Sequence, residues 1–104
     1  MSDVEVRDVP DADRFEAVRD GEVVGHIAYR RTTRGYYAFL HTEVEPAAEG
    51  GGVGSALARG ALEALRENGS EVLPHCPFVK GWIARHEEYV SLVPEAERAR
   101  FDLA

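Results

Sequence analysis

Hydrophobic and polar residues alternate through much of the first half of the chain, and this alternation predicts β-strands. Residues 14–19 alternate and end at Asp20-Gly21, a dipeptide typical of tight hairpin turns. Residues 23–29 continue as the return strand, and the turn residues 33–35 lead into a long aromatic-rich strand at residues 36–44. Three or four antiparallel strands are therefore expected before the middle of the chain.

The second half changes to helical spacing. Every fourth residue from Val53 to Leu65 is apolar, which predicts a buried amphipathic helix that stops at Asn68-Gly69. One more short strand is expected at residues 71–75, and Pro77 is expected to open a second helix that runs to about residue 86. This order predicts an α+β fold with a mainly antiparallel sheet, formed by a single domain over residues 1–104.

Four glycines within five residues join the long strand pattern to the first helix, at residues 50–54. Glycine permits positive φ and close approach to backbone N–H groups, and the helix that follows adds unpaired first-turn amides and the positive end of its dipole. Together these features favour an anion seat that suits a pyrophosphate. The alternative is a flexible connector without a ligand.

Composition narrows the class of protein. The chain has 104 residues, a formal net charge of −7 and a hydrophobic fraction of 44%, which favours a folded globule. The negative charge argues against nonspecific nucleic-acid binding, and no apolar run is long enough to span a membrane. The acidic N-terminus is unlike a signal peptide, so a cytoplasmic protein is expected. With one cysteine and no metal-ligand spacing among the histidines, no metal site is expected.

Cys76 is the first residue with candidate chemistry. It stands directly before Pro77, and proline favours the first position of a helix, so the thiol is expected at the N-cap of the second helix. The helix dipole there would stabilise a thiolate, which is the reactive form of cysteine. The alternative is a buried cysteine that acts as a small hydrophobe.

His41 and Glu43 lie two residues apart on the long strand, so their side chains are expected to share a face with Tyr37 and Phe39. The alternate face, with Leu40 among its residues, is expected to form the core. A histidine and a carboxylate beside an anion loop would serve as a general base and its orienting partner. The alternative is a solvated polar face.

Two residues near the second helix have further candidate roles. Tyr89 would donate a phenol proton to a leaving group, or act simply as a packing residue. Lys80, together with Arg85 and His86, would offset the negative charge of a cofactor, although solvated helix positions are the alternative.

Several of these motifs, at these distances, resemble the GCN5-related N-acetyltransferase superfamily, and most closely its compact single-domain branch, the YjdJ-type N-acetyltransferases. The resemblance covers residues 15–93 and rests on the segments 41–44, 50–57 and 76–86. It implies a GNAT-like sheet with splayed central strands and a cofactor site that runs from the glycine loop into the helix.

The resemblance implies that acetyl-CoA is the donor. The pantetheine arm would lie along Val44, Lys80 would help to offset the charge, and the pyrophosphate would rest on the backbone of Gly50, Gly51, Gly52, Val53, Gly54 and Ser55. Cys76 corresponds to a suspected catalytic cysteine of this branch. One departure is Glu49, which stands where the superfamily loop usually has arginine or glutamine.

These expectations point to an acetyl-CoA-dependent N-acetyltransferase with an unidentified amine acceptor, and with Cys76, His41 and Glu43 as candidate catalytic residues. The amine would attack bound acetyl-CoA directly, or Cys76 would take the acetyl group first. Rival functions are a non-catalytic acyl-CoA-binding or sensing domain and a protein-interaction module without a cofactor. The identity of the acceptor and the oligomeric state do not follow from the sequence.

Overall fold

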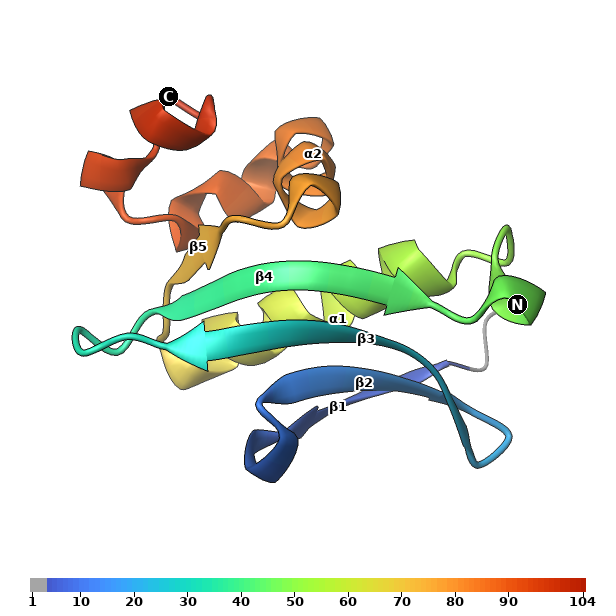
Figure 1. Ribbon diagram of the computed structural model, residues 1–104. Coiled ribbons are helices and arrows are strands. Elements are labelled where there is room, and N and C mark those ends of the chain that lie inside the picture. The colour runs from blue at the N-terminus through green and yellow to red at the C-terminus, as the bar shows by residue number, and fades with distance from the viewer. Residues whose placement is uncertain (1–3) are drawn as a thin grey trace.

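A computed structural model describes residues 4–104 (Figure 1). The expectation that the N-terminus is not a signal peptide rests largely on residues 1–3, which lie outside the described residues. Within the described residues, five strands form one sheet in the order β1-β2-β3-β4-β5. They are Glu5–Val9 (β1), Arg14–Arg19 (β2), Glu22–Arg31 (β3), Tyr37–Val44 (β4) and Val72–Pro74 (β5).

The two helices and several short 3₁₀ turns complete the fold. Helix α1 packs on one face of the sheet, and α2 lies beside the end of β5 (Figure 1). The helices are Val53–Asn68 (α1) and Pro77–Arg85 (α2). The 3₁₀ turns are Pro10–Ala12, Pro46–Ala48, Glu87–Leu92, Glu95–Glu97 and Ala99–Phe101. The predicted α+β class and element order are therefore confirmed.

Local turn chemistry explains the strand connections. Asp20 and Gly21 both have positive φ, at 52° and 80°, as a two-residue hairpin with the right-handed strand twist requires. Helix α1 ends at Gly69, whose left-handed conformation lets its N–H bond to the carbonyls of Leu65 and Arg66. Both features were predicted from the sequence.

The sheet is mixed, because β5 pairs with β4 in parallel while the other three pairs are antiparallel. The parallel pairing covers only Tyr37–Phe39 against Val72–Pro74, and it is extended by a bond from Cys76 N to Phe39 O of 2.9 Å. Beyond that point β4 continues while the chain turns into α2. The strands therefore separate at the edge of the sheet, not at its centre as predicted, since β5 is the last strand. Pro74 fits that edge position, because proline donates no ladder bond.

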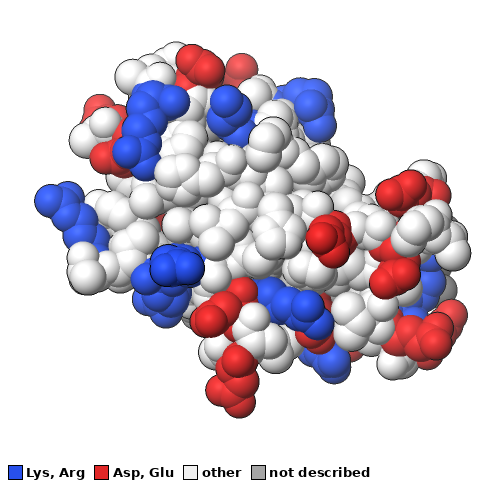
Figure 2. Space-filling model, viewed as in Figure 1, with Lys and Arg blue, Asp and Glu red and all other residues white. Residues whose placement is uncertain are grey.

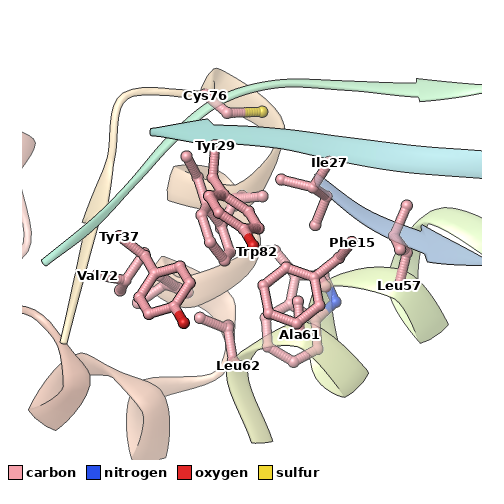
Figure 3. Close-up of a cluster of buried hydrophobic side chains, with 14 of the residues drawn as sticks. Phe15, Ile27, Tyr29, Tyr37, Leu57, Ala61, Leu62, Val72, Cys76 and Trp82 are labelled. Atoms are coloured by element: carbon pink, nitrogen blue, oxygen red, sulfur yellow. The ribbon is translucent and has the colours of Figure 1, made fainter. Parts of the chain in front are cut away.

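The core lies between α1 and the sheet (Figure 3). Phe15 packs against three aromatic rings at centroid distances of 5.4–6.2 Å, those of Tyr29, Tyr37 and Phe39. From α1, the apolar row predicted by the spacing is buried beneath them. This core holds the N-terminus of α1 next to the end of β4, where the glycine loop lies.

The predicted faces of β4 were wrong. Tyr37 and Phe39 point into the core, whereas His41 and Glu43 lie on the opposite, exposed face. The cause is a β-bulge: Tyr29 pairs with Phe39 and the preceding Ala28 pairs with His41, so Leu40 is an extra residue on β4. One extra residue reverses the alternation of side chains, and Leu40 itself is exposed rather than buried.

Candidate functional site

The glycine loop leaves the N-terminus of α1 open. Gly50 and Gly52 have φ of 86° and 80°, a conformation that glycine adopts without strain. The first helical bond runs from Ala56 N to Gly52 O at 3.0 Å, so the amides of residues 53–55 precede the intrahelical bonds. No side chain caps this end, and its first turn contains no acidic residue. The positive end of the helix dipole is therefore available to an anion.

A cavity of about 560 Å³ lies in front of this loop, between the end of β4 and α2. Its lining combines the loop with residues from β4, the 3₁₀ turn before the loop, α1 and α2. These residues are Thr42, Val44, Ala48, Glu49, Gly50, Gly52, Val53, Gly54, Ser55, Phe78, Trp82, Arg85 and His86. Six of the eight predicted cofactor-binding residues are among them. A pocket of this size with an open helix N-terminus at one wall suits a ligand with an apolar arm and a phosphate group.

Trp82 ties the two helices together along this cavity. Its Nε1–H donates to Ser55 Oγ at 2.9 Å, and its ring stacks on that of His86 with centroids 3.8 Å apart. His86 Nδ1 lies 2.7 Å from the carbonyl oxygen of Trp82. Phe78, at the start of α2, is 40% exposed and stands over Gly54. The wall provided by α2 is thus mostly aromatic and held in place by hydrogen bonds.

The charges around the cavity are divided between its two walls. Arg85 and His86 come from the end of α2, whereas Glu49 is the charged residue of the loop. Acidic side chains also gather at the end of the molecule where β4 ends (Figure 2). Lys80 is not brought to this cavity: its Nζ lies 3.8 Å from Asp102 Oδ2 in the C-terminal segment. Gly51 is also outside the lining.

Cys76 occupies the N-cap of α2, as predicted, with Pro77 at the first helical position. Its sulfur does not cap the helix; Sγ instead lies 3.1 Å from Thr42 Oγ1 of β4. Cys76 is 2% exposed and does not line the cavity, whereas Thr42 does. Figure 3 shows the cysteine at the border of the core, where α2 begins. The thiol is therefore separated from the cavity by a single side chain.

His41 and Glu43 form a separate cluster on the outer face of the sheet. His41 Nε2 lies 4.0 Å from Glu43 Oε2, and both side chains are more than half exposed. The ring of His26 on β3 lies 5.7 Å from that of His41. Burial, and after it the positive charge of Arg14, lowers the pKa of His26. The structure therefore brings the predicted base and its partner together, but outside the cavity.

Tyr89 lies outside the cavity as well. It is 2% exposed, and its hydroxyl donates to Glu63 Oε2 at 2.6 Å and accepts from Arg59 Nη1 at 3.1 Å. Burial, followed by the hydrogen bond to Glu63, raises the pKa of Tyr89. These contacts join α1 to the segment after α2, which fits the packing alternative.

Comparison with known proteins identifies the family. A family model described as GCN5-related N-acetyl-transferase matches residues 14–92. The chain belongs to the GCN5-related N-acetyltransferase family. The fold is also similar to the solution NMR structure of a GCN5-like protein from Staphylococcus aureus, assigned as a candidate N-acetyltransferase. That match has 25% identity and a TM-score of 0.65, and it covers 90% of this chain and 91% of the other. A comparison with curated proteins finds no match.

Membership of the GCN5-related N-acetyltransferase family implies use of an acyl-CoA in general terms. Within residues 4–104, no three histidine, cysteine or acidic side chains come together in a way that would hold a metal ion. In the same range no helix is both long enough and apolar enough to cross a membrane.

Sequence reasoning missed several lining residues of this GCN5-related N-acetyltransferase. Phe78 and Trp82 read as ordinary helix residues, because an apolar residue that faces a cavity follows the same spacing as one that faces the core. Thr42 lies between two candidate catalytic residues, but its role depends on contact with Cys76, 34 positions away. Only the bulge at Leu40, which reverses the side-chain alternation, would have indicated that Thr42 points inward.

Proposed function

We propose that this protein is an acetyl-CoA-dependent N-acetyltransferase that moves an acetyl group to an amine. One observation carries the proposal: a single cavity joins the open N-terminus of α1 to Thr42, the residue in contact with Cys76. An anion seat at one end and a nucleophilic side chain near the other match the pyrophosphate and the acetyl thioester of acetyl-CoA, which the pantetheine arm connects. Residues 14–92 match the family, which supports the same assignment.

The proposed cofactor site assigns a role to each wall. The backbone of Gly50, Gly52 and residues 53–55 would hold the pyrophosphate, and Val44 would contact the pantetheine arm. Arg85 and His86 would offset the phosphate charges from α2. Gly51 remains part of the proposed set because it lies between two glycines that line the cavity, whereas Lys80 lies next to Asp102 and outside the cavity. Bound acetyl-CoA would supply an activated acyl thioester. The groups that bind the cofactor and that take the amine proton must come from this chain.

Two routes for the acetyl group follow from the position of Cys76. In the first, the amine attacks the thioester carbon directly, CoA leaves as its thiol, and the amine loses a proton. In the second, the Cys76 thiolate attacks that carbon and CoA leaves as its thiolate. The amine then attacks the acetyl-cysteine, the Cys76 thiolate leaves, and the proton that the amine loses converts the CoA thiolate to its thiol. The 3.1 Å contact between Thr42 Oγ1 and Cys76 Sγ supports the second route, because it places the sulfur next to a residue that lines the cavity.

His41 and Glu43 are proposed as the general base and its partner for an amine that arrives from the exposed face of the sheet. Beyond Phe39, β4 has no pairing with β5, so the edge of β4 on that side is open between the exposed face and the cavity. An amine bound at this edge would attack the acetyl carbon, and His41 would take the amine proton directly or through one water, because a general base must lie within hydrogen-bond reach of the proton that it removes.

The testing experiment is intact-protein mass spectrometry after incubation with acetyl-CoA, for the wild type, Cys76→Ala and Cys76→Ser. A hydroxylamine-labile gain of one acetyl group in the wild type alone is expected for a thioester at Cys76. Cys76→Ala is expected to lower turnover about tenfold or more, with acetyl-CoA binding nearly unchanged. Unchanged turnover in both variants would remove Cys76 from the mechanism.

A non-catalytic acyl-CoA-binding or sensing domain is the second candidate. Two observations favour it. The carboxylate of Glu49 lines the cavity and opposes a phosphate ligand, and Cys76 is almost completely buried. Release of free CoA thiol with a panel of primary amines separates the two functions. An enzyme releases the thiol with at least one amine, whereas a sensor binds CoA and releases none.

A further inference from the structure

Arg19, the last residue of β2, brings a guanidinium group to the glycine loop. Its Nη2 lies 3.6 Å and its Nη1 4.0 Å from the point where a Cβ on Gly51 would stand. Arg19 lines a second hollow beside the cofactor cavity, and Ala48 lines both. The sequence places Arg19 more than 30 positions from the loop, so only the tertiary fold brings the two together.

The guanidinium of Arg19 is unpaired within residues 4–104. Among the described residues it makes no side-chain hydrogen bond and no ion pair, although Glu22 and Glu45 line the same hollow. By contrast, Arg14 on the same strand and Arg7 on β1 both form ion pairs with Glu16, at 2.8 Å and 3.3 Å. Arg19 is also partly buried. A partly desolvated cation that is not paired with an anion is unfavourable, and an anion bound at the loop would relieve that cost.

The glycine loop contributes no cationic side chain to the cavity. Its amides and the α1 dipole favour an anion, but the charged side chain that the loop itself contributes to the cavity is Glu49. A carboxylate at that position opposes a phosphate ligand. Arg19 supplies a positive charge to the same loop from another strand, and the planar fork of a guanidinium can bond to two phosphate oxygens at once.

We infer that Arg19 is a phosphate-binding residue of the cofactor site and supplies the cation that position 49 lacks. The inference rests on the proposed function, since it assumes a CoA ligand. Gly50 and Gly52, on either side of Gly51, both line the cavity, so the guanidinium is within one residue of the lining. In the proposed binding mode the pyrophosphate rests on the loop backbone, so Arg19 is assigned to that group.

The experiment is isothermal titration of CoA and of 3′-dephospho-CoA into the wild type, Arg19→Gln, Arg19→Lys and Arg34→Gln. Arg34, in the β3–β4 turn, is the matched control, because it is exposed and lies at the other end of β4 from the loop. Arg19→Gln is expected to weaken binding of both ligands about tenfold, as for loss of one charge-assisted hydrogen bond. The affinity of Arg19→Lys is expected to lie between those of the wild type and Arg19→Gln, and the affinity of Arg34→Gln to stay within about twofold of the wild type.

Salt provides a second readout that a purely structural role of Arg19 would not change. The difference in affinity between the wild type and Arg19→Gln is expected to shrink as salt rises from about 50 to 500 mM, because screening weakens the phosphate contact. Circular dichroism and thermal unfolding establish that each variant is folded.

The results separate the role of Arg19 from its assignment to the pyrophosphate and from the proposed function. Equal affinity of the wild type and Arg19→Gln for CoA would overturn the inference alone, as would an equal loss in Arg34→Gln. A loss seen with CoA but not with 3′-dephospho-CoA would overturn the assignment to the pyrophosphate. If the wild type fails to bind CoA, the proposed function is overturned and the role of Arg19 with it.

Discussion

Gly60 offers a sharp test of the packing between α1 and the sheet. It lies in the interior of α1, where alanine normally stabilises a helix by about 1 kcal/mol relative to glycine. Here a Cβ would stand 2.7 Å from both Cβ and Cγ2 of Val6 on β1, and 3.1 Å from Cγ1. Non-bonded carbons prefer a separation of about 3.5–4.0 Å, so β1 or α1 must move by nearly 1 Å.

The magnitude follows from two opposing contributions to the free energy of unfolding. Overpacking of a closely packed contact costs about 1–3 kcal/mol, and the helix propensity of alanine returns about 1 kcal/mol. Gly60→Ala is therefore expected to lower the stability by about 1 kcal/mol. The cost cannot be avoided by a rotamer change, because one of the two nearest atoms is the Cβ of Val6, which moves only with the backbone.

Gly81, in the interior of α2, is the matched control. The nearest atom to a Cβ there is Arg85 Nη1 at 3.5 Å, the end of a flexible side chain, so Gly81→Ala is expected to raise stability by about 0.5–1 kcal/mol. The assay is urea unfolding with equal slopes for the three proteins. The double variant Val6→Ala/Gly60→Ala is expected to recover part of the loss, since the Cγ contacts disappear and the Cβ contact stays. A Gly60→Ala protein as stable as the wild type would refute the reasoning.

Two further predictions concern hydrogen-bonded side chains outside the cavity. Tyr89→Phe removes the hydroxyl bonded to Glu63, so urea unfolding should show a loss of about 1–2 kcal/mol, while CoA affinity should not change; a large fall in affinity would contradict this. Hydrogen bonds from Arg14, the largest cause, and from Arg7 lower the pKa of Glu16, so its stabilising contribution is complete above the ordinary value of 4.5 and is lost as the pH falls through the lowered pKa. Glu16→Gln should therefore be less stable than the wild type at pH 7, and the difference in free energy of unfolding should narrow below about pH 4.5. A difference that stays constant with pH would argue against a lowered pKa of Glu16.

Much of the fold was predictable because the relevant preferences act over a few residues. The turn at Asp20-Gly21, the four-residue apolar spacing of α1 and the stop at Gly69 all depend on neighbouring backbone conformations, and all three were confirmed. The N-cap position of Cys76 was predictable for the same reason, since Pro77 favours the first helical position.

The faces of β4 were not predictable in this way. A simple alternation places Tyr37, Phe39 and His41 on one face, but the bulge at Leu40 reverses it halfway along the strand. A bulge arises from two-against-one pairing with β3, so the residues of β4 alone do not reveal it. The same limit applies to the strand order, because the parallel pairing of β5 with β4 depends on how α1 crosses the sheet.

The sequence by itself determined which segments become strands and helices, and it determined that a glycine-rich loop meets an open helix N-terminus. These features follow from the φ/ψ preferences and spacing of residues that are close in the chain. Only the tertiary structure decided which side chains meet across long separations. It put Thr42 against Cys76, took His41 and Glu43 to the exposed face, and brought Arg19 to Gly51. Such contacts depend on strand register and helix packing, which no local preference encodes.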